Sequence, residues 1–182
     1  MARATAVQLT GIERTFDQDQ IIVSKTDLTG HLTYANELFL GIARYAEDEV
    51  LGQPHSLVRH PDMPRAIFDL LWETLKAGRE IFAFVINRGK DGSHYWVLAH
   101  VTPTLVDGTC IGYHSNRRVP PPRALRTITA VYQTLLQEEA RHSDKRSAVQ
   151  AGKRKLQSIL DQAGQTYDEY IWSLINAEEV PS

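Results

Sequence analysis

The chain has 182 residues, of which 42% are hydrophobic and 23% are charged, and its formal net charge is -2. These values are typical of a soluble globular protein with one domain and a smaller addition, and they exclude a global field that attracts nucleic acid or membranes. The single cysteine excludes an intrachain disulfide and a multi-cysteine metal site. No apolar run approaches the ~18 residues of a membrane span and no signal peptide is evident, so we expect a cytoplasmic protein without direct membrane insertion.

The first half of the chain predicts a hairpin followed by helices. Residues 1–19 are weakly periodic and read as an N-terminal extension. β-branched residues at 21–24 and a short run at 31–34 flank a turn, which predicts two paired strands. Short stretches with helical spacing follow between 36 and 58. A stronger amphipathic pattern over 66–77 then predicts a longer helix that Gly78 ends.

The second half predicts three long strands and two helices. The strands span 80–88, 94–105 and 109–118, with turns at Asp91-Gly92 and Asp107-Gly108. Five strands in this order favour an α+β fold, an antiparallel sheet with short helices gathered on one face. Such a fold encloses a small space that suits a small molecule or cofactor. Beyond the proline run at 120–122, helical patterns cover about 124–136 and 144–176, with Gly164 as a candidate break.

One irregular segment stands out, Arg59-His60-Pro61-Asp62-Met63-Pro64. Its two prolines prevent regular structure and hold three polar side chains together, which is typical of a binding site. The same residues also suit a simple cap on the next helix. Together with this segment, six further stretches of the chain form the pattern by which it can be compared with a known family: Val23-Ser24-Lys25-Thr26-Asp27-Leu28, Tyr34-Ala35-Asn36, Gly52-Gln53-Pro54-His55, Leu71-Trp72-Glu73-Thr74-Leu75-Lys76-Ala77-Gly78, Asn87-Arg88-Gly89-Lys90-Asp91-Gly92-Ser93-His94-Tyr95-Trp96-Val97 and Gly112-Tyr113.

Over roughly residues 20–120 this pattern resembles PAS domains, and most of all the flavin-binding PAS domains of bacterial aerotaxis receptors. The resemblance implies a PAS sensor domain over 20–119, followed by signalling or dimerisation helices over 120–182. It also implies FAD as the cofactor. The residues that it places beside FAD are Asn36, Arg59, His60, Asp62 and Asn87.

The residue types agree with flavin chemistry. An asparagine amide such as that of Asn87 can both donate and accept hydrogen bonds along the pyrimidine edge of the ring. Arg59 can neutralise part of a pyrophosphate charge, and His60 can donate to a phosphate or ribose oxygen. Trp72 and Trp96 are aromatic side chains that can border the ring, although plain core packing also explains both.

One departure from the family concerns Ile81-Phe82-Ala83. The family commonly has a tryptophan that borders the flavin, a small residue and a glycine at these positions. The difference leaves open a PAS interaction or dimerisation module without a cofactor. The histidines leave open a gas sensor that binds haem through one axial histidine. Those within the domain are His31, His55, His60, His94, His100 and His114.

No phosphate-binding loop, nucleophile elbow, kinase motif or metal-ligand spacing occurs, so we expect no enzyme activity. The basic residues after 140 are interspersed with acidic ones, which favours a solvated helix face over a nucleic-acid site. The sequence therefore predicts a redox or oxygen sensor for aerotaxis or related signalling. We expect a homodimer that relays the redox state of FAD to a transmembrane chemoreceptor or another signalling protein.

Overall fold

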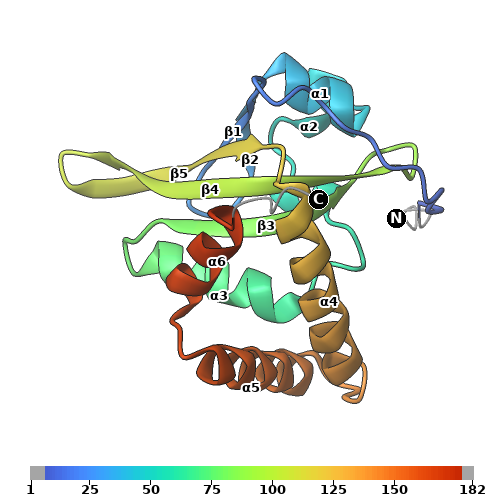
Figure 1. Ribbon diagram of the computed structural model, residues 1–182. Helices are drawn as coiled ribbons and strands as arrows, with labels where there is room; N and C mark the ends of the chain where they lie inside the picture. The colour runs from blue at the N-terminus through green and yellow to red at the C-terminus, as the bar shows by residue number, and fades with distance from the viewer. Residues whose placement is uncertain (1–6, 178–182) are drawn as a thin grey trace.

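The computed structural model describes residues 7–177, and within this range five strands form one antiparallel sheet in the order β2-β1-β5-β4-β3 (Figure 1). The predicted α+β class and the five-stranded sheet are confirmed. The elements are β1 (Ile22–Thr26), β2 (Leu32–Ala35), α1 (Glu37–Ala43), α2 (Glu47–Val50), the 3-10 helix η1 (His55–Val58), α3 (Arg65–Lys76), β3 (Ile81–Arg88), β4 (His94–Val106), β5 (Thr109–Arg118), α4 (Pro122–Glu139), α5 (Lys145–Ala163) and α6 (Tyr167–Ile175).

Different helices pack on the two faces of the sheet. Successive side chains of a strand point to opposite faces, so β3 presents Val85 to the helices η1 and α3, and Phe84 to the other side. On that other side Tyr132 of α4 donates a hydrogen bond to the carbonyl of Phe84, at 2.6 Å. Trp172 of α6 packs there against Phe82, with ring centroids 4.8 Å apart. Helices α4 and α6 therefore cover the face that the short helices leave free.

Asn36 fixes the start of α1. Its side-chain oxygen accepts hydrogen bonds from the amide of Phe39 at 3.1 Å and from that of Val23 at 3.0 Å. Its side-chain nitrogen donates to the carbonyl of Ile21 at 2.9 Å. One amide thus caps the helix and ties it to β1, which is the ordinary role of asparagine at a helix N-terminus.

The described part of the N-terminal extension runs along the turn between β3 and β4. The amide of Thr10 donates to Gly92 at 3.0 Å, and the amide of Arg14 donates to His94 at 2.8 Å. The Arg14 side chain also forms an ion pair with Asp91 at 2.7 Å. This segment is therefore docked on the domain as an added extended strip.

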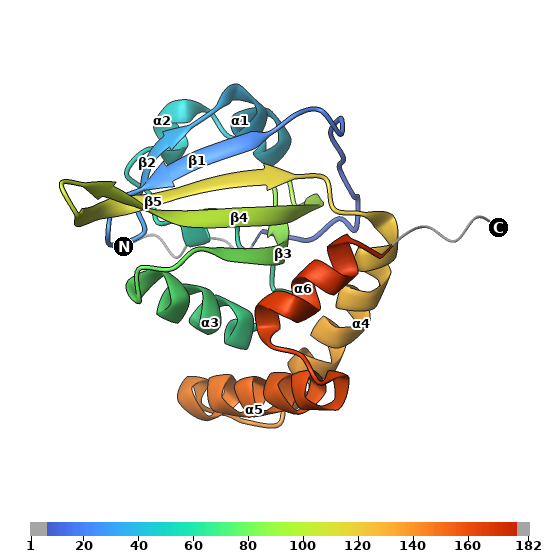
Figure 2. The same cartoon turned by 60° about the vertical axis from the view of Figure 1, so that its left-hand side comes forward.

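The C-terminal helices are attached to α3. The helix predicted over 144–176 is divided at Gly164, whose positive φ of 65° ends α5. In both views α5 runs along the side of α3 that faces away from the sheet (Figures 1 and 2). Within residues 7–177, no helix is both long and apolar enough to cross a membrane.

Two polar contacts make this attachment specific. Glu139, buried at the end of α4, accepts hydrogen bonds from the amides of Arg65 and Ala66, at 3.1 and 2.9 Å. These amides begin α3, where Pro64 offers no capping side chain. Lys153 of α5 forms ion pairs with Asp69 at 2.9 Å and Glu73 at 2.6 Å. The start and the outer face of α3 are thus both held by the C-terminal helices.

The packing of α5 on α3 is tested by Gly152→Ala. A Cβ atom there would lie 2.8 Å from the Cβ of Ala66 and 2.8 Å from a carboxylate oxygen of Glu139. We expect the free energy of unfolding to fall by about 1–3 kcal/mol, as for other overpacked sites. The matched control is Gly41→Ala in α1, where a Cβ meets nothing within 4 Å. That change should stabilise by about 0.5–1 kcal/mol. Urea unfolding measures both, and equal stabilisation would contradict the packing.

Candidate functional site

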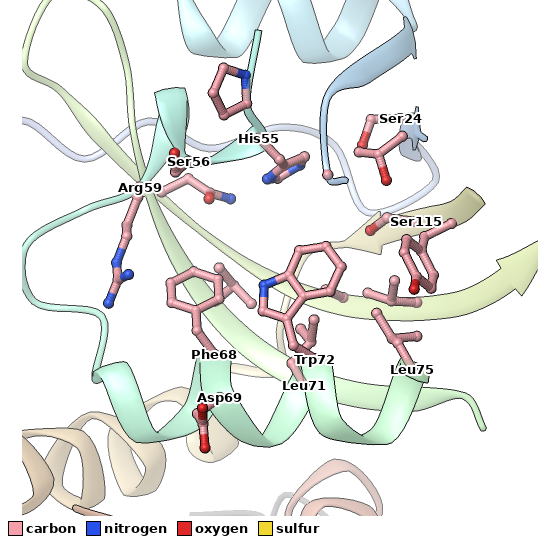
Figure 3. Close-up of a pocket in the computed structure, with 18 of the residues that line it drawn as sticks. Ser24, His55, Ser56, Arg59, Phe68, Asp69, Leu71, Trp72, Leu75 and Ser115 are labelled. Carbon is pink, nitrogen blue, oxygen red and sulfur yellow. The ribbon is translucent and has the colours of Figure 1, made fainter. Parts of the chain in front are cut away.

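A cavity of about 480 Å³ lies between the sheet and the helices η1 and α3 (Figure 3). This volume is within the roughly 300–1,000 Å³ of small-molecule sites. Phe68 and Trp72 project into it from α3, and His55 enters from the opposite side. The strands contribute Ser24 and Thr26 of β1, Val85 and Asn87 of β3, Ala99 and Val101 of β4, and Tyr113, Ser115 and Arg117 of β5.

Arg117 is the charged group at the inner wall of the cavity. It is buried, and its Nη2 donates to the hydroxyl of Ser24 at 2.8 Å and to Nε2 of His55 at 2.6 Å. Its guanidinium lies 5.6 Å from the ring centroid of Phe39. Within residues 7–177 no carboxylate pairs with it. Burial lowers the pKa of Arg117 to about 10, so the group keeps its positive charge at neutral pH.

His55 is neutral in this arrangement. Burial, followed by the charge of Arg117, lowers the pKa of His55 to about 3. Neutral Nε2 accepts the hydrogen bond from Arg117, which leaves the proton of the ring on Nδ1. Of the described residues, His55 is the one histidine in the lining. Because Nε2 is already engaged, this ring is poorly placed to ligate a haem iron.

Several polar groups of the lining have no partner in the part of the chain that the structure describes. They include the hydroxyls of Thr26 and Ser115 and the second terminal nitrogen, Nη1, of Arg117, all of them buried. The side-chain amide of Asn87, a residue that is 2% exposed, lines the same cavity. A buried polar group without a partner costs about 1–3 kcal/mol. The cavity is therefore matched to a ligand that carries both donors and acceptors.

The irregular segment singled out in the sequence reaches the cavity through Arg59. Its backbone pairs with that of Asn87 as an antiparallel bridge, which brings the two residues together at β3. The guanidinium lies 4.5 Å from the ring centroid of Phe68 and donates to the carbonyl of Met63 at 3.4 Å. Burial and the nearby charge of Arg65 lower the pKa of Arg59.

Three of the residues predicted to bind the cofactor line the cavity together: Arg59, Trp72 and Asn87. Four others lie outside the lining. Asn36 caps α1 through the contacts described above. His60 is buried behind β4, with its ring 5.7 Å from that of His94, and Asp62 is exposed.

Trp96 is the fourth of these residues, and it points to the opposite face of the sheet. Its ring lies 6.1 Å from that of Tyr132 in α4. Along a strand, residues that are an odd number of positions apart point to opposite faces of the sheet. Trp96 is three positions from Ala99 and five from Val101, and both of those line the cavity. Trp96 therefore packs against the core on the α4 side of the sheet.

Ile81 and Ala83, which differ from the residues common in the family, lie away from the cavity lining. Both side chains are buried in β3, but neither lines the cavity. The aromatic surface comes instead from α3 and β5, where Trp72 meets Tyr113 edge to face with centroids 5.4 Å apart. The missing strand tryptophan therefore does not leave the cavity without aromatic rings.

A family model described as the PAS fold matches residues 13–113. The chain belongs to the PAS fold family. It is 40% identical over 117 residues to the aerotaxis receptor of Escherichia coli (strain K12), a match that covers 64% of this chain and 23% of the receptor. It is 32% identical over 89 residues to the nitrogen fixation regulatory protein of Klebsiella pneumoniae, covering 49% of this chain and 18% of that protein. This PAS domain thus spans less than a quarter of either relative.

Solved structures agree on the fold. The PAS domain superposes with a TM-score of 0.54 and 19% identity on a light-oxygen-voltage domain studied with a flavin analogue, over 63% of this chain and 86% of that one. It superposes with a TM-score of 0.53 and 18% identity on the dark structure of the blue-light photoreceptor Aureochrome1, over 65% and 87%. These structures confirm the predicted fold, and the family model and the match to the aerotaxis receptor confirm the predicted family.

The pairing of His55 with Arg117 predicts a pH-dependent stability. In the unfolded chain His55 has an ordinary pKa near 6.5, so the unfolded state takes up the proton first as the pH falls. Stability is therefore lost between pH 6.5 and about 3, with a slope of at most about 1.4 kcal/mol per pH unit from this residue. We expect His55→Gln to flatten the slope by roughly 1 kcal/mol per unit between about pH 5 and 6.5.

Urea unfolding at several pH values measures this effect. The range lies above that in which ordinary carboxyl groups titrate. His142→Gln, in the loop between α4 and α5, serves as the control and should keep the slope of the unchanged protein. Equal slopes for the His55 variant and the unchanged protein would contradict a neutral, buried His55.

Proposed function

We propose that this PAS domain binds a flavin, FAD, in the cavity and serves as a cytoplasmic redox or oxygen sensor. The observation that carries the proposal is the buried cation of Arg117 in an aromatic-lined cavity, beside the hydroxyls of Thr26 and Ser115, which have no partner among the described residues, and beside the amide of Asn87. The isoalloxazine ring is planar and apolar over its faces, with donors and acceptors along one edge. Those two properties match the rings of α3 and the polar groups of the sheet.

Each lining residue has a role in this proposal. The Asn87 amide would both donate to and accept from the pyrimidine edge. Arg117 would give a charge-assisted hydrogen bond to an electron-rich atom of the ring system. Trp72 would border the apolar surface of the ring. When bound, the flavin supplies reversible uptake of electrons and protons, the chemistry that a redox sensor requires.

The route from the cavity to the C-terminal helices passes through α3. This helix carries Phe68 and Trp72 on its inner side, while Glu139 and Lys153 hold its start and its outer side. A change of one hydrogen bond in the cavity is worth about 1 kcal/mol. That is enough to change a two-state equilibrium roughly five-fold. We propose the packing of helices α4, α5 and α6 on the domain as the element that responds.

We further propose a homodimer, and a transmembrane chemoreceptor or another signalling protein as the partner. The relatives support this by their nature, since one is a receptor and the other a regulatory protein. In this role the domain relays a signal and performs no catalysis.

The absorbance spectrum of the purified protein tests the proposal directly. We expect visible flavin bands that bleach on addition of dithionite, with FAD released on denaturation. A Soret band would indicate haem instead. A colourless protein that takes up no added FAD would contradict the proposal and favour an interaction module without a cofactor.

The role of Arg117 is tested by Arg117→Ala with Arg118→Ala as the matched control. Arg118 is the next residue of β5 and is exposed, so both variants lose one positive charge from neighbouring positions. Loss of a hydrogen bond from a charged group costs about 1.5–3 kcal/mol, or roughly 10- to 100-fold in Kd. Flavin fluorescence titration should show that loss for Arg117→Ala alone. Equal affinities of the two variants would contradict the role, provided that circular dichroism shows both folded.

A further inference from the structure

The outer end of the cavity carries three cations from three different segments. Arg59 comes from the irregular segment, Arg65 is the first residue of α3, and Lys145 is the first residue of α5. Arg65 and Lys145 are exposed, so this end faces solvent, and we call the three residues the cationic mouth. Figure 3 shows Arg59 at one end of the cavity, with Ser24 and Ser115 at the other.

The nearby carboxylates are already engaged. Asp69 also lines the cavity, but it is paired with Lys153, and Figure 3 shows it pointing away from the rings of Phe68 and Trp72. Glu139 accepts from the amides that begin α3. Asp144 accepts from the amide of Ser147 at 2.8 Å. Within residues 7–177 none of the three cations of the mouth forms an ion pair.

Arg59 and Arg65 are two like charges at this end of the cavity. Burial and then the repulsion from Arg65 lower the pKa of Arg59, while the carboxylate of Glu139 acts in the opposite direction. An anion between them relieves this repulsion and accepts their hydrogen bonds. Arginine is suited to paired contacts with phosphate oxygens, and lysine adds a mobile point charge.

We infer that the cationic mouth binds the diphosphate of the dinucleotide, and that Lys145 makes α5 a part of the cofactor site. This inference rests on the flavin function proposed above. The flavin ring occupies the inner part of the cavity, and the diphosphate lies between Arg59, Arg65 and Lys145. Since the PAS match ends at residue 113, Lys145 is a contribution of the C-terminal helices outside the shared fold. The cofactor then touches directly the helices that we propose respond to it.

If the cationic mouth binds the diphosphate, a change in it will affect the binding of flavins that carry phosphates and not of those without them. FAD carries the diphosphate, whereas riboflavin has the same ring and no phosphate. The experiment therefore titrates both ligands, by flavin fluorescence, into the unchanged full-length chain, Lys145→Gln and the control Arg146→Gln. Arg146 is the neighbouring exposed cation of α5, and it does not line the cavity.

We expect Lys145→Gln to weaken FAD binding roughly ten-fold and to leave riboflavin binding unchanged. Arg146→Gln should leave both affinities unchanged. In the unchanged protein, FAD binding should weaken as salt is added more than riboflavin binding does, because ions screen an exposed contact with phosphate.

Two results would overturn the inference while leaving the flavin proposal intact. In the first, Lys145→Gln binds FAD as tightly as the unchanged protein. In the second, FAD and riboflavin lose affinity equally, which would show a general effect on the fold. If neither ligand binds to any of the three proteins, the proposed flavin function itself fails, and this inference fails with it.

Discussion

The burial of Arg117 with no carboxylate partner among the described residues is the constraint on which the cavity depends. A guanidinium removed from water needs hydrogen-bond acceptors, and the fold supplies them from β1 and η1 through Ser24 and His55. This requirement keeps His55 neutral and ties η1 to the sheet. It also leaves at the cavity wall a positive charge and the nitrogen Nη1, which has no partner in the described part of the chain and can donate to an electron-rich ligand.

Helix α3 connects this cavity to the rest of the chain because both of its sides are occupied. Its inner side carries the aromatic rings of the lining, and its outer side packs on α5. Gly152 allows the two helices to approach closely, and the carboxylate of Glu139 replaces the missing cap at the start of α3. In the function proposed above, α3 is the route by which a change in the cavity would alter the packing of the C-terminal helices.

The sequence motif identified the family correctly, but it did not separate the residues that line the cavity from those that lie outside the lining. Asn36 and His60 belong to the motif, yet the first caps α1 and the ring of the second lies against that of His94. Arg117 was missed, although it shares the strand phase of Tyr113 and Ser115. The alternation of side chains along β5 was the available signal. A charged residue at a position of this strand that faces the core is a candidate for a binding site. Of the cationic mouth, the sequence motif pointed to Arg59 alone, and nothing in the sequence pointed to Arg65 or Lys145.

The sequence by itself determined the α+β class, the five strands, the break at Gly164 and the family, because these depend on local periodicity, turn residues and short motifs. It also placed Arg59, Trp72 and Asn87 among the candidates. Only the tertiary structure decided which side chains meet. Residues as distant in sequence as Ser24 and Arg117, or Arg59 and Lys145, converge through sheet register and helix packing, and no local pattern specifies those long-range contacts.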